Sequence, residues 1–367
     1  MLRETRLEID ARNLDKNLEV FRKLIRPGTK ILANLKGNAY GMGAPLIGKY
    51  LEEKNIDYFS VAYLNEGIAL RKSGIKAKIL VFNPALFHFE ALITYKLEPE
   101  VSSLHYLEKL ISFLREKRIK NFPVHIKFDT GMHRAGIEMD EIYKLIEILK
   151  KSPEIKLQSI FSHLAAAEDP AKDAFTWNQF KSFDKIIELL QTHIPYSFFK
   201  HILNTAGVFR FPEKQYDMIR PGLGIFGYNL VEKNQKDLYP IGVLKTAINQ
   251  IKTLKKGESA GYNQKFIAPK DHTKIALLPI GYADGFPRKA GNGKWKVSLG
   301  GKRVPVIGNV SMDTISIDVT GISCNPGDEV VIYDNKDDIY KMARLLQSIP
   351  YEVTSSVTAR VERILKP

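Results

Sequence analysis

The chain has 367 residues and a formal net charge of +14, and 44% of its residues are hydrophobic. This length predicts two domains, or one large barrel with an extension. Charges run through residues 1–18 and no apolar run reaches about 18 residues, so we expect neither a signal peptide nor a membrane span. The lone Cys324 cannot form an intramolecular disulfide. These features together predict a cytoplasmic protein.

The positive charge is spread along the chain in short basic pairs, usually near turns, such as Arg71-Lys72 and Lys255-Lys256. These pairs do not form a stripe interleaved with aromatic residues. We therefore interpret them as a solvated surface and expect no nucleic-acid partner.

Short apolar runs alternate with amphipathic stretches between about residues 30 and 235. The strand-like runs cover 30–35, 57–64, 78–83, 97–101, 123–129, 156–164, 199–204 and 217–222, and clear helical stretches cover 43–54, 103–117, 138–150 and 174–192. Such alternation predicts parallel strands with right-handed crossovers. About eight units favour an α/β class fold with a (β/α)₈ TIM-type barrel. The run 97–101 is the weakest unit, and an open doubly wound sheet is the alternative.

Beyond about residue 240 the pattern changes to strand-like runs joined by glycine turns, at 294–309, 314–321 and 327–334. Gly300-Gly301 between two alternating runs predicts a hairpin. One helix is expected at 337–347. We therefore predict a barrel domain at 11–238 and a mainly-β domain at 239–367.

Several polar residues stand at the carboxyl ends of the predicted barrel strands, where barrel enzymes place their chemistry: Lys36, Lys127, Asp129, His163, Asn204, Thr205 and Arg220. A partly desolvated lysine amine attacks aldehydes, which suits pyridoxal phosphate, although an isolated lysine is more simply explained as a surface residue. The loops 204–207 and 220–224 follow the seventh and eighth strands, where barrels commonly bind phosphate.

At this point the chain resembles bacterial alanine racemase along nearly its whole length. The motifs that carry the resemblance are TRLEID (5–10), LKGNAYGMG (35–43), IKFDTGMHRAGI (126–137), HILNTAG (201–207), MIRPGLGIFGY (218–228), SAGYNQKF (259–266), GYADGFPR (281–288), VIGNVSMD (306–313) and YEVTSSVTARVER (351–363). The resemblance implies a pyridoxal 5'-phosphate barrel and a β-domain that also takes in the strand at 1–10. It implies a head-to-tail homodimer that interconverts L- and D-alanine and supplies D-alanine for peptidoglycan, without a metal.

The resemblance also assigns roles to individual residues. Lys36 matches the lysine that holds the cofactor and acts as one base, and Tyr262 of a second chain matches the other base. Residues that match cofactor contacts are Tyr40, Thr205, Gly222 and Leu223 at the phosphate, Arg220 at the pyridine nitrogen, and His163, which bonds to that arginine.

A second group of matches concerns the substrate. Arg134 and Met312 match substrate-binding residues, and Lys127 matches a lysine that is often carbamylated and then pairs with Arg134. Tyr282 and Asp313 match residues at the entrance.

Three positions depart from the family pattern, namely Met42, Pro221 and Ala359, where a histidine, an aromatic residue and a tyrosine are common. They put substrate strictness in question. A broader amino-acid racemase acting on serine or lysine is one alternative, but its relatives carry a signal peptide and a cysteine pair. A non-enzymatic cofactor-binding protein is another, but such proteins lack a β-domain. A barrel decarboxylase would need a cysteine–aspartate motif, which the chain lacks.

Overall fold

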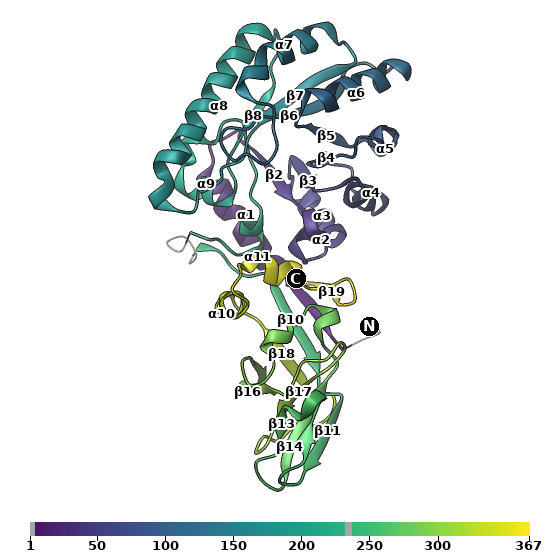
Figure 1. Ribbon diagram of the computed structural model, residues 1–367, viewed down its shortest axis with the longest axis vertical. Coiled ribbons are helices and arrows are strands. Elements are labelled where there is room, and N and C mark those ends of the chain that lie inside the picture. The colour runs from purple at the N-terminus through teal and green to yellow at the C-terminus, as the bar shows by residue number, and fades with distance from the viewer. Residues whose placement is uncertain (1–3, 232–236) are drawn as a thin grey trace.

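Eight parallel strands form a barrel in the computed structural model, which describes residues 4–231 and 237–367 (Figure 1). The hydrogen-bonded order is β8-β7-β6-β5-β4-β3-β2-β9. The strands are β2 (Lys30–Asn34), β3 (Tyr58–Val61), β4 (Lys78–Val81), β5 (Glu98–Val101), β6 (Phe122–Lys127), β7 (Ile155–Phe161), β8 (Phe199–His201) and β9 (Met218–Ile219).

The two end strands, β8 and β9, are joined at their edges by backbone hydrogen bonds. The Asp217 amide donates to the Lys200 carbonyl at 3.1 Å, and the Arg220 amide donates to the Leu203 carbonyl at 3.0 Å. The sheet is therefore nearly closed. This confirms the predicted barrel, and the alternative of an open sheet is wrong.

The weakest predicted unit, 97–101, is the strand β5. All four of its residues are buried, and it pairs in parallel with β4 and β6. Glu98 and Glu100 alternate along it and are both buried. Because side chains two apart in a strand point to the same side, one face of this short strand is acidic.

Helices cover the outside of the barrel. They are α1 (Ala11–Leu24), α3 (Ala44–Glu53), α4 (Leu64–Lys72), α5 (Phe89–Thr94), α6 (Leu104–Glu116), α7 (Ile142–Lys151), α8 (Asp173–His193) and α9 (Thr205–Arg210). The predicted apolar face of α7, formed by Ile142, Leu145, Ile146 and Leu149, is buried. None of the helices described is both long and apolar enough to cross a bilayer.

A second sheet of nine strands has the order β11-β14-β17-β16-β15-β18-β10-β1-β19. Its strands are β1 (Arg6–Asp10), β10 (Gly242–Ala247), β11 (Gln250–Leu254), β14 (Thr273–Leu278), β15 (Lys296–Leu299), β16 (Lys302–Ile307), β17 (Ile315–Asp318), β18 (Glu329–Tyr333) and β19 (Glu362–Lys366). A small ribbon, β12 (Ser259–Ala260) with β13 (Phe266–Ile267), and two helices, α10 (Lys336–Leu346) and α11 (Pro350–Ser355), complete this part.

The strand β1 lies inside this second sheet although it opens the described chain. It pairs antiparallel with β10 and parallel with β19. Residues 1–3 and 232–236, which fall within the predicted domain ranges, lie outside the described residues.

The hairpin predicted at Gly300-Gly301 is present between β15 and β16, with Leu299 opposite Lys302. Gly300 and Gly301 have φ of 55° and 78°. Positive φ at both central residues is the geometry of a type I′ turn, which glycine adopts without steric cost. The predicted helix 337–347 corresponds to α10.

Short 3₁₀ turns lie in the loops: η1 (Met139–Glu141), η2 (Pro170–Lys172), η3 (Pro212–Lys214), η4 (Leu223–Phe226), η6 (Tyr262–Gln264), η7 (Tyr282–Asp284) and η8 (Arg288–Ala290). The second sheet and α11 meet the barrel at its first loop. The Arg363 guanidinium of β19 donates to the Gly41 carbonyl from Nε at 3.0 Å and from Nη2 at 2.8 Å.

Candidate active site

A cavity of about 320 Å³ opens at the carboxyl ends of the barrel strands. It brings together many of the residues predicted for the site: Lys36, Tyr40, Lys127, Arg134, His163, Thr205, Arg220 and Gly222. Other lining residues were not predicted from the sequence, chiefly Asn34, Glu100 and Tyr351. The position of the cavity is the one at which barrel enzymes carry out chemistry.

Lys36 begins a turn, α2 (Lys36–Tyr40), with an uncommon backbone. Gly37, Asn38 and Ala39 have φ of 53–60° and ψ of 42–50°, the left-handed helical region. This conformation is costly for residues other than glycine and persists only where contacts fix it. Here the Gly37 amide donates to Glu66 Oε1 at 2.7 Å, and the Asn38 side chain accepts from the Ala44 amide at 2.8 Å. The turn is thus held at both ends, which fixes the start of the Lys36 side chain.

The pKa of Lys36 is lowered, first by burial and then by the positive charges of Arg134 and Arg220, while Glu66 opposes the shift. Both causes favour the neutral amine. A neutral amine is the nucleophilic form of lysine, so the environment of Lys36 suits attack on an aldehyde.

Arg220 is buried at the end of β9 and is held by several acceptors. Its Nη1 donates to His201 Nδ1 at 2.8 Å, and its Nη2 donates to the Ser162 carbonyl at 2.7 Å and to His163 Nδ1 at 3.3 Å. The predicted Arg220–His163 contact is therefore present, but the shorter histidine contact is with His201. His201 lies in the motif HILNTAG and was not singled out from the sequence.

The arginine determines the direction of a buried hydrogen-bond chain. A guanidinium only donates, so His201 Nδ1 must accept, and Nε2 carries the proton that is donated to Ser159 Oγ at 2.9 Å. Ser159 Oγ lies 2.6 Å from His125 Nδ1, and His125 Nε2 lies 2.6 Å from Glu98 Oε2. Burial and the charge of Arg220 lower the pKa of His201 well below its usual range, which keeps that ring neutral. The chain links Arg220 to a carboxylate deep in the barrel.

Tyr40, Thr205 and Gly222 meet on one side of the cavity. Thr205 Oγ1 accepts from the Gly222 amide at 3.0 Å and from the Gly224 amide at 3.3 Å. A Cβ on Gly222 would lie 2.6 Å from the Tyr40 hydroxyl, so only glycine leaves this wall open. Leu223 follows at the start of η4 and is fully buried; it does not line the cavity.

The charges in the cavity are unequal. Four lining side chains are basic, namely Lys36, Lys127, Arg134 and Arg220, whereas Glu100 is the only acid among the lining residues. An excess of positive charge in a partly enclosed site favours an anionic ligand. Glu100 could have been found from the sequence, because it stands two residues after Glu98 in a barrel strand.

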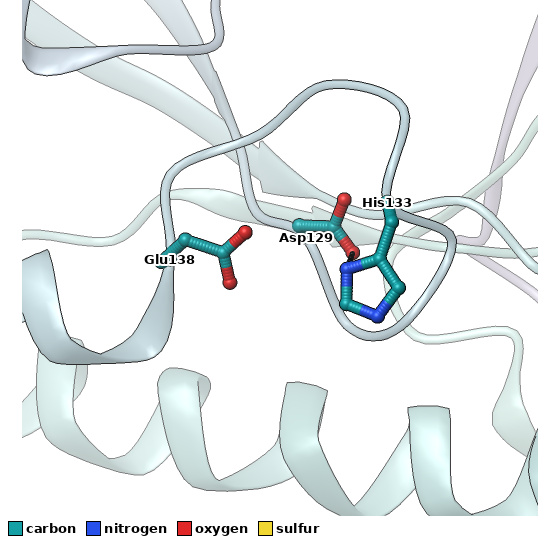
Figure 2. Close-up of side chains that lie close together, drawn as sticks. All are labelled: Asp129, His133 and Glu138. Carbon is teal, nitrogen blue, oxygen red and sulfur yellow. Dashed lines mark ion pairs between the residues drawn. The ribbon is translucent and has the colours of Figure 1, made fainter.

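Arg134 is presented by a loop between Phe128 and Ile137, two residues joined by an isolated β-bridge. Asp129 holds this loop: its carboxylate accepts from the Gly131 amide at 2.8 Å and from the Arg134 amide at 3.2 Å. Asp129, His133 and Glu138 lie close enough for one ion to reach them all, as Figure 2 shows. The Asp129 oxygens are already used by the backbone, so we interpret this cluster as a loop support.

Four predicted residues lie elsewhere. Tyr262, Met312, Tyr282 and Asp313 are exposed residues of the β-rich part and do not line the Lys36 cavity. Tyr262 is 72% exposed. It belongs to a separate groove with Asn309, whose side-chain amide donates to the Tyr262 carbonyl at 3.1 Å.

The three departures from the family pattern line neither this groove nor the Lys36 cavity, and Pro221 is buried. Met42 is fully buried, and Ala359 is exposed. Tyr351, which lines the cavity, packs edge-on against the Tyr40 ring at 5.8 Å between centroids. An aromatic side chain therefore does stand beside Tyr40, although it comes from α11.

Comparison with known proteins adds independent information. The model of the alanine racemase N-terminal domain matches residues 9–230, and the model of the alanine racemase C-terminal domain matches residues 241–365. Together the two models cover nearly the whole chain.

Individual alanine racemases are also similar to this chain over nearly its whole length. An alanine racemase of Clostridium kluyveri is 37% identical over 370 residues, covering 97% of this chain and 93% of that protein. The structure of an alanine racemase of Clostridium difficile superposes with a TM-score of 0.93 at 31% identity and covers 100% of this chain and 96% of that one. An alanine racemase of Bartonella henselae with covalently bound pyridoxal phosphate gives a TM-score of 0.86 at 26% identity, over 99% of each chain. These matches confirm the predicted resemblance, and the chain belongs to the alanine racemase family.

Proposed function

We propose that this protein racemises alanine with pyridoxal 5'-phosphate, using Lys36 on one side of the substrate and Tyr262 of a second chain on the other. The observation that carries the proposal is the cavity in which Lys36 and Arg220 meet at the carboxyl ends of the barrel strands. Membership in the alanine racemase family supports the choice of reaction and substrate.

The residues of the cavity fit this cofactor. Its aldehyde needs an amine, and the pKa of Lys36 is lowered towards the nucleophilic form. Its phosphate needs cationic surroundings and donors, and Tyr40 and Thr205 bring hydroxyl groups to a wall that Gly222 leaves open. The Bartonella henselae relative carries the same group bound covalently. When bound, the cofactor withdraws electrons from the substrate and makes its α-hydrogen acidic.

Arg220 sets the electronic character of the site. It can only donate hydrogen bonds, so a pyridine nitrogen facing it must accept and stay unprotonated. His163 and His201 are both acceptors towards Arg220 and hold its position. An arginine in this place weakens the electron withdrawal, which favours return of the proton over other reactions.

Racemisation requires proton transfer on two opposite faces of one carbon. Lys36 supplies one group, and we assign to it the proton of D-alanine. Tyr262 is assigned the proton of L-alanine. Tyr262 follows β12 and precedes β13, which lies at the end of the molecule away from the barrel (Figure 1). A tyrosine in that position serves a barrel cavity only when a second chain brings it there, which supports a head-to-tail homodimer.

Other roles extend the same proposal. Arg134 and the backbone at Met312 would bind the substrate carboxylate, and Tyr282 and Asp313 would form the entrance. Met312 and η7 already lie together, because the Ala283 amide donates to the Met312 carbonyl at 3.0 Å. The same proposal includes a domain boundary between residues 238 and 239, a cytoplasmic location and a supply of D-alanine for peptidoglycan.

The test measures α-hydrogen exchange in deuterated water with each alanine enantiomer, together with turnover on alanine, serine and lysine. We expect exchange with both enantiomers and the highest kcat/KM on alanine. Lys36→Ala should abolish exchange and the visible absorption of the bound cofactor. Higher kcat/KM on serine or lysine would favour the broader racemase, and cofactor absorption without exchange would favour a binding protein.

A further inference from the structure

We propose that Glu100 supplies the negative charge beside Arg134 and keeps Lys127 as an unmodified ion-pair partner, so that Lys127 does not carry a carbamate in this chain. The proposal deepens the assignment of Arg134 as a substrate-binding residue and rests on the proposed function to that extent. It makes Glu100 a positioning residue.

The first observation is the position of Glu100. Its Oε1 lies 3.4 Å from Lys127 Nζ, and Glu100 and Lys127 are 2% and 7% exposed. The two residues stand on the neighbouring strands β5 and β6 and both line the cavity. The carboxylate of Glu100 therefore lies beside the amine on which a carbamate would form.

The second observation concerns the other oxygen. Among the described residues, Glu100 Oε2 is buried and has no hydrogen-bond partner. A buried acceptor without a partner carries a desolvation penalty, so it is available for an incoming donor. Arg134 lines the same cavity, and its guanidinium makes no hydrogen bond or ion pair among the described residues. Oε2 is thus the acceptor that this arginine lacks.

The third observation is electrostatic. The charged groups that act on Glu100 are the cations Lys127, Arg134 and Arg220. Burial, and then the charge of Glu100, raise the pKa of Tyr106 in α6, which stays a neutral phenol. Burial raises the pKa of Glu100 to about 7, while Lys127, Arg134 and Arg220 oppose that shift. Above this pH Glu100 is ionised and compensates one of the cations. The lining residues contribute no second acid.

Carbamylation needs the neutral amine. The Lys127 nitrogen would attack the carbon of CO₂, form an N–C bond and lose one proton to solvent, leaving an anionic carbamate. Burial lowers the pKa of Lys127, and the Glu100 carboxylate opposes that shift, so it favours the ammonium form, which has no lone pair. The carboxylate also repels the anionic product. Two buried anions a few ångströms apart are strongly disfavoured.

The experiment adds ¹³C-bicarbonate to the cofactor-loaded protein near pH 8 and records the ¹³C carbamate resonance. We expect no such resonance above the detection limit in the natural protein. In Glu100→Gln we expect a resonance at least about tenfold above that limit, since removal of one charge lifts the repulsion. Glu100→Asp keeps the carboxylate and should remain without the resonance. The double variant Glu100→Gln, Lys127→Arg should show no carbamate resonance. Its absence there would assign the resonance of Glu100→Gln to Lys127.

A carbamate resonance in the natural protein that Lys127→Arg removes would overturn the proposal, and so would a folded Glu100→Gln variant without the resonance. If Glu100→Gln does not fold, the natural protein and Lys127→Arg decide the question by themselves. Alanine racemisation is assayed on the same samples: its absence would count against the proposed function, whereas the resonance reports only on Lys127 and Glu100.

Discussion

At the scale of single residues, the site is dominated by ionisable groups that the barrel removes from water. Lys36, Lys127 and Arg220 all have lowered pKa values with burial as the largest cause, and burial raises that of Glu100. Burial favours the neutral form in each case, and neighbouring charges decide how far the shift goes. The chemistry of the cavity therefore depends on a balance between desolvation and pairing.

Glu100 makes stability depend on pH. Its pKa is raised from 4.5 to about 7 on folding, so the protonated form stabilises the fold below pH 4.5 and this contribution is lost as the pH rises to about 7. The free energy of unfolding of the natural protein, relative to that of Glu100→Gln, should fall by up to about 3 kcal/mol across this window.

Urea denaturation of both proteins at pH values from 4.5 to 8 measures this difference. The glutamine variant is the control, because it keeps the shape of the side chain but does not titrate. A difference that stays constant or rises with pH would contradict a raised pKa at Glu100.

Ser159 is the middle member of the buried chain that ends at Arg220. Ser159→Ala should destabilise the protein by about 1–3 kcal/mol, because it leaves the Nε2 proton of His201 and the Nδ1 acceptor of His125 without partners. Ser112→Ala, at an exposed position of α6, should change stability by no more than about 0.5 kcal/mol. Equal effects of the two changes in thermal unfolding would show that the chain contributes nothing.

The sequence predicted the cavity residues at the strand ends better than the side chains that pair with them. Lys36, His163 and Arg220 follow apolar runs, and they do line one cavity. His201 and Glu100 escaped notice because each is a polar residue inside or near a short strand, where the sequence alone does not tell which side faces the barrel interior. For Glu100, only its alternation with Glu98 along the predicted strand indicated that the two acids face the same side.

At the scale of elements, the turn α2 shows how local strain is carried by tertiary contacts. Ala39 and Tyr40 adopt positive φ of 53° and 55° next to Lys36. The strain is of the order of 1–3 kcal/mol per residue and must be offset by surrounding structure. Gly41, which ends the turn, lies against α11, since a Cβ there would stand 2.0 Å from the Thr354 carbonyl oxygen.

Gly41→Ala should therefore destabilise the protein by about 3 kcal/mol or more, through both a positive φ and a backbone clash. Gly28 is a matched control: it has the same φ of 86°, and nothing lies within 4 Å of the Cβ position. Gly28→Ala should cost only the conformational term, about 1 kcal/mol. If chemical denaturation shows similar losses of unfolding free energy for Gly41→Ala and Gly28→Ala, the contact between Gly41 and α11 is not tight.

Regular elements were predictable because their signals are local. Apolar runs marked the barrel strands, period-3.6 patterns marked α7, and Gly300-Gly301 marked the β15–β16 hairpin. The left-handed turn at α2 was not predictable, because Asn38, Ala39 and Tyr40 have no intrinsic preference strong enough to specify it. The contacts of Glu66 and Thr354, which are distant in sequence, hold it in place.

At the scale of the whole molecule, the barrel and the second sheet were recognisable from the change of pattern near residue 240. The pairing of β1 with β19 joins the two ends of the chain. Periodicity carries no information on such distant pairs; only the resemblance to alanine racemases implied that the first strand joins the β-domain. The same limit applies to Tyr262, because without the resemblance nothing in the sequence selects it over other tyrosines as the second base.

In the proposed enzyme, one active site takes Lys36 from one chain and Tyr262 from another. Co-expression of Lys36→Ala with Tyr262→Phe tests this sharing of residues between two chains. Each variant alone should be inactive in alanine racemisation. Random pairing makes half of the dimers mixed, and one of the two sites in each mixed dimer is intact, so about a quarter of the natural activity should return. Co-expressed variants that remain as inactive as each variant alone, although mixed dimers are found by mass spectrometry, would contradict the claim.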